Sequence, residues 1–444
     1  MRSHLPSLFT SLFLTSACAM AGTLHVPADY DTLQDAVDAA ADGDEILIGP
    51  GNWTVGFVPP STPQVVDTLG KSLVIRSTDG PEKTSIDGEG RRRVITVSPN
   101  KYATVHLDGL TITGGDTDER GGGIYAPETN LTITNCIITG NAAYDFGAGV
   151  CCWHSNLVME RCTVSDNSGH ASGGGLRCLG SGTVSISDCT FTSNRTWQYS
   201  GGAISLYGII TGSVTNCIIS NNECTFGFGG GLSMWSGCQV NVANCTITGN
   251  ACGGQMGEGG GISCRSACIS TITDCLITGN TGIRGGGLYL HDRSEVYLAR
   301  CEIKSNTAEH GGGIQNSQKC IVTLDNCVVS NNIKTGLAGG GILTDYWNPD
   351  ESWEPIRLVD TFVCDNTPDQ IDGFWLGYGT TEVSDDCPTC TGDATGDGVI
   401  NVDDVLHVLS AWGGYDPEAD VDDDGLVDVN DVLLLLSRFG TPCP

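Results

Sequence analysis

Short apolar runs and glycine-rich turns alternate with a regular period along most of this chain. The segment TNCIITGN, residues 134–141, returns as ERCTVSDN, SDCTFTSN, TNCIISNN, ANCTITGN, TDCLITGN, ARCEIKSN and DNCVVSNN, about 26 to 30 residues apart. A glycine motif such as GGGI or GGGL interleaves with these copies, and apolar and polar residues alternate between the two motifs. Alternation with period two is typical of half-buried strands. Each unit is therefore predicted to hold three short strands and no helix.

Units of this size cannot bury an apolar face alone, so stacking as turns of a parallel β-helix is the predicted fold. The position three residues before the recurring cysteine is always apolar and is predicted to point inward: Ile133, Met159, Ile186, Val214, Val242, Ile272, Leu298, Leu324 and Leu358. The cysteine column itself is Leu110, Cys136, Cys162, Cys189, Cys217, Cys245, Cys275, Cys301, Cys327 and Thr361. Because leucine and threonine replace cysteine at the two ends, the column selects a small, mostly apolar side chain. Free cysteine is such a residue, so we expect reduced thiols there.

An asparagine ends each copy of the motif: Asn141, Asn167, Asn194, Asn222, Asn250, Asn280, Asn306, Asn332 and Asn366. An amide side chain both donates and accepts, so a stack of amides is expected to satisfy the backbone groups of the turns. The glycines are interpreted as turn residues with positive φ or close backbone contacts, not as a phosphate-binding loop, because they precede strands rather than a helix.

The segment before the repeats predicts a helix with Leu33, Val37 and Ala40 on one face, followed by a β-branched strand. Such a helix would cap the open end of the stack. The entry helix, the segment DGDEILIGPGNW and the ladders together resemble the right-handed parallel β-helix proteins of the pectate-lyase-like class over residues 22–386. We expect a cap and irregular turns in 22–105 and regular repeats in 106–386.

The composition changes after residue 386, where two acidic loops 27 residues apart are each followed by an apolar helix. Oxygen ligands at positions 1, 3, 5, 7, 9 and 12, with glycine at position 6, match a calcium-binding loop. The predicted ligands are Asp393, Thr395, Asp397, Val399, Asn401 and Asp404 in the first loop and Asp420, Asp422, Asp424, Leu426, Asp428 and Asp431 in the second. We expect two Ca²⁺ ions and calcium-dependent folding of this small all-α module, with a solvated acidic linker as the alternative.

The duplicated loop and helix resemble a type I dockerin over residues 392–440 of a module that spans 392–444 and follows a linker at 387–391. The ending LSAWG is similar to tails of secreted planctomycete proteins. The resemblance implies calcium binding and docking to a cohesin-like partner. Positions 10 and 11 are Val402-Asp403 and Val429-Asn430 instead of the Ser-Thr type, so another surface protein is the second possible partner.

The net charge of the chain and a predicted signal peptide further limit the possible functions. The chain has 21 basic and 52 acidic residues and a net charge of −31, which argues against nucleic acid and anionic membranes as partners. Residues 1–21 read as a secretory signal peptide with a cleavage site at Ala19-Met20-Ala21, and no later stretch is apolar for long enough to span a bilayer. We therefore expect a secreted, extracellular or cell-surface protein.

Export permits disulfides, and two groups of cysteines lie outside the repeating column. Cys224 and Cys252 follow the motif asparagine by two residues in adjacent turns, and we interpret them as a disulfide on a loop. Cys387, Cys390 and Cys443 flank the C-terminal module, and a disulfide that joins its ends is a second possibility.

Outward columns supply candidate site residues. Glu258, Arg284 and His310 precede the glycine motif on successive turns and are candidates for acid-base chemistry on an acidic sugar, with a stacked salt bridge as the alternative. Asp116, Asp118, Glu119, Arg120 and Asp145 form a second cluster, which suits calcium, paired carboxylates for glycoside hydrolysis, or a solvated acidic loop. The outward aromatic residues Trp153, Trp197, Tyr199, Phe226 and Phe228 are the candidates for stacking on sugars.

Two function classes remain open on this sequence. In the first, the rod binds polysaccharide or surface partners and is attached through the calcium-dependent module. In the second, it is a polysaccharide lyase or an O-glycosyl hydrolase that acts on acidic polysaccharide. Fold alone does not decide between an enzyme and a binding protein.

Overall fold

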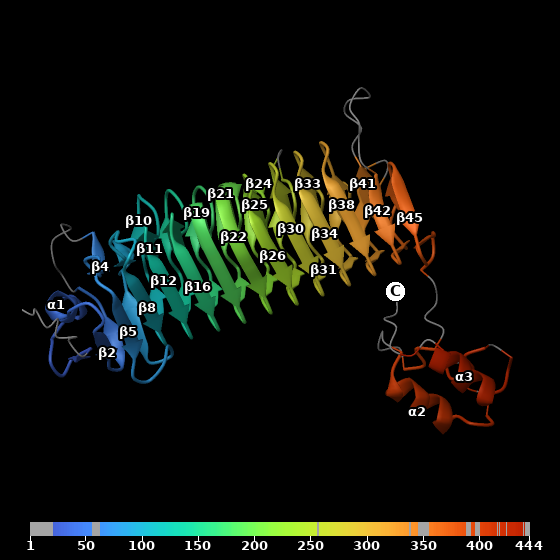
Figure 1. Cartoon of the computed structure of the whole chain (residues 1–444), viewed down its shortest axis with the longest axis horizontal. Helices are drawn as coiled ribbons and strands as arrows, with labels where there is room; N and C mark the ends of the chain where they lie inside the picture. The colour runs from blue at the N-terminus through green and yellow to red at the C-terminus, as the bar shows by residue number, and fades with distance from the viewer. Residues whose placement is uncertain are drawn as a thin grey trace, which may run out of the picture.

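The protein is a rod of stacked β-coils followed by a small helical module (Figure 1). The computed structural model describes residues 21–55, 63–254, 257–336, 339–344, 355–387, 392–395, 400–414, 416, 418–422, 424–437 and 439. The predicted signal peptide, apart from Ala21, lies outside the described residues. The fold is mostly β, with three short helices in the described part of the chain. The parallel β-helix predicted from the repeats is confirmed.

A 24-stranded sheet contains two ladders of parallel strands that two long strands join. The first ladder, whose strands follow the glycine motif in the regular turns, contains β4 (Gln64–Asp67), β7 (Arg93–Thr96), β11 (Ile124–Pro127), β15 (Val150–Trp153), β19 (Leu176–Ser187), β22 (Ile204–Thr215), β25 (Leu232–Trp235), β29 (Ile262–Arg265), β33 (Leu288–His291), β37 (Ile314–Asn316), β41 (Ile342–Thr344) and β44 (Ile371–Asp372). The second ladder contains β1 (Thr23–Val26), β2 (Glu45–Ile48), β5 (Leu73–Ser77), β8 (Thr104–Asp108), β12 (Asn130–Thr134), β16 (Asn156–Glu160), the ends of β19 and β22, β26 (Gln239–Ala243), β30 (Ile269–Thr273), β34 (Glu295–Ala299), β38 (Ile321–Asp325), β42 (Ile356–Val359) and β45 (Trp375–Tyr378).

Two further parallel sheets complete each coil. The 13-stranded sheet, whose strands follow the cysteine column in the regular turns, contains β3 (Gly51–Trp53), β6 (Thr84–Asp87), β9 (Thr111–Thr113), β13 (Ile137–Thr139), β17 (Thr163–Ser165), β20 (Thr190–Thr192), β23 (Ile218–Ser220), β27 (Thr246–Thr248), β31 (Leu276–Thr278), β35 (Glu302–Lys304), β39 (Val328–Ser330), β43 (Phe362–Cys364) and β46 (Glu382–Val383). The nine-stranded sheet contains β10 (Asp116–Thr117), β14 (Ala142–Ala143), β18 (Ser168–Gly169), β21 (Arg195–Ser200), β24 (Glu223–Phe228), β28 (Ala251–Cys252), β32 (Thr281–Arg284), β36 (Thr307–His310) and β40 (Ile333–Lys334).

Helix α1 (Leu33–Ala39) lies at the N-terminal end of the rod, as the sequence predicts (Figure 1). Thr32 caps it by accepting a hydrogen bond from the Asp35 amide at 3.1 Å. Leu33, Val37 and Ala40 are buried and belong to the same apolar core as the first strands. The helix therefore covers the end of the stack that strands would otherwise leave exposed.

The two interior columns predicted from the repeat are confirmed. Every residue of the apolar column is fully buried, and the eight cysteines of the cysteine column are unpaired thiols with 3% exposure or less. Thr361 continues that column and satisfies its hydroxyl by donating to the Val359 carbonyl at 2.8 Å. Burial raises the pKa of the Cys136 thiol to about 12, so this thiol is neutral at physiological pH.

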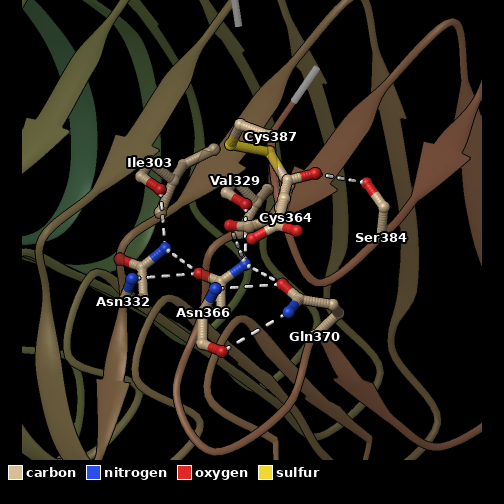
Figure 2. Close-up of a disulfide and its surroundings, with 9 residues drawn as sticks. Ile303, Val329, Asn332, Cys364, Asn366, Gln370, Ser384 and Cys387 are labelled. Carbon is tan, nitrogen blue, oxygen red and sulfur yellow. Dashed lines mark hydrogen bonds between the residues drawn. A yellow bond between two sulfur atoms is a disulfide. The ribbon is translucent and has the colours of Figure 1, made fainter. Parts of the chain in front are cut away.

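The asparagines form a continuous hydrogen-bonded ladder. Each side-chain amide donates to the Oδ1 of the next asparagine at 2.9–3.0 Å, from Asn141 through to Asn366. Figure 2 shows where the ladder ends: Asn366 Nδ2 donates to Gln370 Oε1 at 2.9 Å. The predicted structural role of these residues is confirmed.

The disulfide interpretation of Cys224 and Cys252 is wrong. The two residues are register partners in β24 and β28, and both are buried thiols, not loop cysteines. The disulfide of the described residues joins Cys364 in β43 to Cys387, which ties the segment after β46 to the last coil (Figure 2). Cys387 therefore does not link the two ends of the C-terminal module, and Cys390 and Cys443 lie outside the described residues.

The C-terminal module consists of two short helices and their loops. Helices α2 (Val402–Ser410) and α3 (Val429–Ser437) contact each other, and their buried residues form a small core separate from that of the rod. Asn401 caps α2 in a capping box with Asp404. None of the described helices is long and apolar enough to cross a membrane.

Candidate functional site

A groove of about 940 Å³ runs along the outside of the rod where the nine-stranded sheet meets the first ladder. Its walls come from the ends of β14, β18 and β21 on one side and from β11, β19, β22 and β25 on the other. The glycine motif lies at the corner between these walls. Gly173 has a φ of 70°, and a Cβ there would lie 2.6 Å from the Leu176 carbonyl oxygen, so the corner accepts only glycine.

Two outward columns supply most of the groove chemistry. One precedes the glycine motif and includes Arg120 and Phe146; the other is the second residue of each ladder strand and includes Tyr125 and Arg177. Parallel register stacks the members of each column along the rod. Unlike the interior columns, these change residue type from one turn to the next.

Two arginines of the groove are paired with carboxylates. Arg93 donates to Glu119 at 3.1 Å and Arg120 to Asp145 at 3.0 Å. Burial alone lowers the pKa of Arg120, but its hydrogen bond with Asp145 and the Asp145 charge outweigh burial and raise it. These ion pairs fix the positions of Glu119 and Asp145 at the groove wall.

Aromatic rings line the groove at several levels. Tyr144 and His170 stack with their ring centroids 4.4 Å apart and their planes 7° from parallel, and Tyr144 is 61% exposed. The Arg120 guanidinium lies 4.9 Å from the Trp153 ring. Tyr207 and Trp235 meet edge to face at 5.3 Å.

A second hollow, of about 320 Å³, adjoins the groove and is lined by Trp197, Tyr199, Phe226 and Phe228. It exists because β21 and β24 are six residues long, whereas β14, β18 and β28 have two. Trp197 and Phe226 meet edge to face with ring centroids 5.7 Å apart. Two longer turns therefore carry an aromatic platform that the neighbouring turns lack.

The structure brings together several residues of the predicted sites. Asp118, Glu119, Arg120, Asp145 and Tyr199 all line the groove. Trp197, Phe226 and Phe228 line the adjoining hollow, and Trp153 packs against Arg120. Asp116 is exposed in β10 and is not among the residues that line the groove.

Sequence reasoning missed Arg93, Tyr144, His170, Arg177 and Tyr207, which also line the groove. Arg177 and Tyr207 could have been identified from their positions, four and six residues after the first glycine of the motif. These are alternate positions of a strand, and alternate positions lie on the same face. Tyr144 and His170 lie three residues before that glycine on successive turns.

Glu258, Arg284 and His310 lie elsewhere, on later turns. Glu258 is 5% exposed and pairs with Arg284 at 3.0 Å and with Arg265. Burial raises the pKa of Glu258, and the two arginines partly offset that effect. His310 is the register partner of Arg284 and is exposed. The Glu258–Arg284 pair on successive turns is a stacked salt bridge, the alternative to a catalytic role for these residues.

The two acidic loops of the C-terminal module contain equivalent hydrogen bonds between a carboxylate and backbone amides. In the first, the Asp404 carboxylate accepts from the amides of Thr395 at 3.0 Å and Asn401 at 2.8 Å. In the second, the Asp431 carboxylate accepts from the amides of Asp422 at 3.1 Å and Asp428 at 2.7 Å. The described carboxylate–amide contacts of the two loops therefore match, with each partner 27 residues from its counterpart.

The second loop has the donor set of a hard-cation site. Carboxylate oxygens of Asp420, Asp422 and Asp424 lie within 4.8 Å of one another. Burial, and then the neighbouring carboxylates, raise the pKa of Asp422, as expected where like charges are held together. Oxygen ligands in this arrangement fit Ca²⁺. In the first loop, Asp393, Thr395 and Asn401 are described, whereas Asp397 and Val399 lie outside the described residues.

Comparison with known proteins identifies the fold of the rod. Three solved structures are similar: the A-module of a mannuronan C-5 epimerase from Azotobacter vinelandii (14% identity, 79% of this chain and 92% of that one, TM-score 0.42), a pectate lyase (11%, 89% and 83%, 0.32) and a pectin methylesterase from Aspergillus niger (11%, 85% and 89%, 0.24). Among curated proteins, none matches the sequence. A family model described as right handed beta helix region matches residues 95–207 and 174–347, which is more than half of the chain. The protein therefore belongs to the right-handed β-helix family.

Proposed function

We propose that this chain is an exported β-helix protein that binds polysaccharide along the groove and is attached through its C-terminal module. The observation that carries the proposal is the groove itself, where aromatic rings and charged side chains from successive turns line one continuous surface. Pyranose rings stack their C–H faces on aromatic side chains, and their hydroxyls need polar partners. The groove lining, which includes Tyr144, His170 and the two arginine–carboxylate pairs, offers both.

The enzymatic alternative, a lyase or hydrolase, uses the same groove. It requires an acid or base that is free to exchange a proton with the substrate. Glu119 and Asp145 each pair with an arginine, so neither carboxylate is free to act on a substrate without breaking that ion pair. The groove therefore supports binding better than cleavage.

Retention and cleavage assays on one set of polysaccharides test the proposal. The chain from residue 22 onward is passed over insoluble neutral and acidic polysaccharides, and the soluble fraction is examined for chain shortening. We expect retention without shortening, and a loss of about tenfold in affinity when both Tyr144 and His170 are replaced by alanine. Tyr102→Ala is the matched control, because Tyr102 is 80% exposed and lies away from the groove. Fragments with an unsaturated end would instead identify a lyase, and no retention at all would reject the proposal.

For attachment, we propose that each acidic loop binds one Ca²⁺ ion, and that the module, residues 392–444 after a linker at 387–391, docks on a cohesin-like or other surface protein. Ca²⁺ would be held by Asp393, Thr395, Asp397, Val399, Asn401 and Asp404 and by Asp420, Asp422, Asp424, Leu426, Asp428 and Asp431. A matching pair of exposed apolar stripes supports docking: Val402, Leu406 and Leu409 on α2 with Trp412 just after it, and Val429, Leu433 and Leu436 on α3 with Phe439 just after it. Each residue of one stripe lies 27 positions from its counterpart in the other.

Calorimetric titration of the chain with calcium tests this part. The double variant Asp422→Asn, Asp424→Asn is expected to lose binding at the second loop, because three hard oxygen ligands then carry one charge instead of three. Asp403→Asn is the control, since Asp403 lies on the exposed face of α2 and is not a predicted ligand. Equal calcium binding by all three proteins would contradict the site.

A further inference from the structure

Arg177 lies on the floor of the groove and differs from its neighbours in the same column. The register of the first ladder stacks Cys151, Arg177 and Ser205 on successive turns. Arg177 is 6% exposed and lines the groove from β19. A single arginine therefore occupies a buried position where adjacent turns carry small uncharged side chains.

The contacts of Arg177 are all with uncharged groups. Its guanidinium lies 5.4 Å from the Phe146 ring and 5.3 Å from the Tyr207 ring. Nη1 donates to Ser200 Oγ at 3.2 Å and to Ser205 Oγ. Nε has no hydrogen-bond partner in the described part of the chain. Rings and hydroxyls hold the guanidinium in place without neutralising it.

No carboxylate of the described residues lies within ion-pair distance of Arg177, in contrast to the other two arginines of the groove. Cys151, its register neighbour, does not compensate the charge either. Burial raises the pKa of the Cys151 thiol to about 12, so this thiol is neutral at physiological pH. Burial lowers the pKa of Arg177, but arginine still keeps its proton in proteins.

A buried charge without a counter-ion is costly, and replacing it by an apolar side chain normally does not reduce stability. The protein also has an excess of 31 negative charges, so the positive potential at Arg177 is local to the groove floor. Retention of such a charge beside an accessible groove is explained if the groove receives an anion. The planar guanidinium matches a carboxylate or sulfate, whose oxygens it binds in pairs.

We propose that Arg177 binds an anionic substituent, a carboxylate or a sulfate, of the carbohydrate in the groove, and so selects acidic over neutral polysaccharide. The inference rests on the proposed function and deepens it. Phe146 and Tyr207 fix the direction of the guanidinium, and Tyr144 with His170 offers the surface on which the sugar ring packs.

Matched ligands and two variants test the proposal on the chain from residue 22 onward. The ligands are polygalacturonate, its fully methyl-esterified form, a sulfated galactan and a neutral galactan. The wild type is expected to prefer the carboxylated or the sulfated polymer, and the stronger of these two identifies the substituent. Arg177→Met is expected to lower affinity for that polymer at least about tenfold and to leave the neutral and esterified polymers unchanged. Arg177→Lys keeps the charge but not the planar fork, so its affinity for that polymer should lie between those of the wild type and Arg177→Met.

Arg300→Met controls for the loss of a positive charge, since Arg300 is an exposed residue that pairs with Asp274 away from the groove. Folding is followed through the melting temperature, which Arg177→Met should not lower. If Arg177→Met does not fold, the melting temperatures of the wild type and of Arg177→Lys are compared instead. Each is measured with galacturonic acid, with sulfate and with galactose. An increase in melting temperature with an anion but not with galactose, and a smaller increase in Arg177→Lys, supports the site.

The outcomes separate the two proposals. Equal affinity of the wild type and Arg177→Met for every polymer overturns the role of Arg177 while leaving polysaccharide binding intact. If no polymer binds but an anion raises the melting temperature through Arg177, the proposed function fails and the anion site stands. If neither polymers nor anions bind, both are wrong.

Discussion

The asparagine ladder and the groove are built from the same turns, yet they follow opposite rules. The ladder repeats one residue type on nine turns, and every amide before Asn366 donates to the asparagine of the next turn. The groove columns change from turn to turn, for example from Cys151 to Arg177 to Ser205, and one guanidinium there lacks a charged partner. Regular, satisfied columns hold the scaffold together, whereas the irregular and incompletely satisfied columns are where we propose that a ligand binds.

Removal of one amide from the middle of the ladder is expected to have the largest effect on the stability of the rod. Asn250 accepts from the amide nitrogen and side chain of Asn222 at 3.0 and 2.9 Å and donates to Ile219 O and Asn280 Oδ1 at 2.8 and 3.0 Å. In Asn250→Ala these buried groups lose their partners, so we expect a loss of about 4 kcal/mol in unfolding free energy, measured by urea titration. Asn241→Ala, at an exposed position of β26, should change it by less than about 0.5 kcal/mol. Equal effects of the two substitutions would show that the ladder does not stabilise the rod.

Unfolding at alkaline pH tests whether water is excluded from the interior columns. The expected change in unfolding free energy is smaller than that of Asn250→Ala. Burial raises the pKa of Cys136 to about 12 from the ordinary 9.0. The unfolded chain therefore loses this proton first, and the stabilising contribution is complete below about pH 9 and disappears as pH rises to about 12. Between pH 8 and pH 10, Cys136→Ala is expected to lose about 1.4 kcal/mol less stability than the wild type in urea titrations. Parallel curves for the two proteins would mean that water reaches this thiol.

Repetition explains how much of the molecule could be predicted from its sequence. Because cysteine and asparagine recur at fixed positions, the sequence alone predicted the interior columns and the roles of Cys136 and Asn141. Helix α1 was predictable for a similar reason, since Leu33 and Val37 repeat at helical spacing. Cys224 and Cys252 were misassigned because the residues after the motif asparagine were interpreted as a loop, whereas the structure continues the sheet through them in β24 and β28.

The groove could be predicted only in part, because a functional column carries no repeated residue type. Glu119, Arg120 and Asp145 were found as an acidic cluster with one arginine, which is visible in the sequence as a local excess of charge. Arg177 is a single arginine in an otherwise ordinary strand, and its significance depends on what lies within a few ångströms of it. Unpaired charge is a property of three-dimensional neighbours, so no pattern along the chain reports it.

A substitution in the aromatic hollow beside the groove is expected to change ligand binding only slightly. Trp197 is 46% exposed and meets Phe226 edge to face, in the aromatic hollow that two longer turns create. If the hollow extends the binding surface, Trp197→Ala should weaken polysaccharide retention by about 1 kcal/mol, or roughly fivefold, without changing the melting temperature. Tyr297→Phe, on an exposed position of β34 away from both hollows, is the control. Because Trp197 contributes little to the core, unchanged retention in Trp197→Ala would confine the ligand to the turns around Arg177 and show that irregularity in a turn is not by itself evidence of binding.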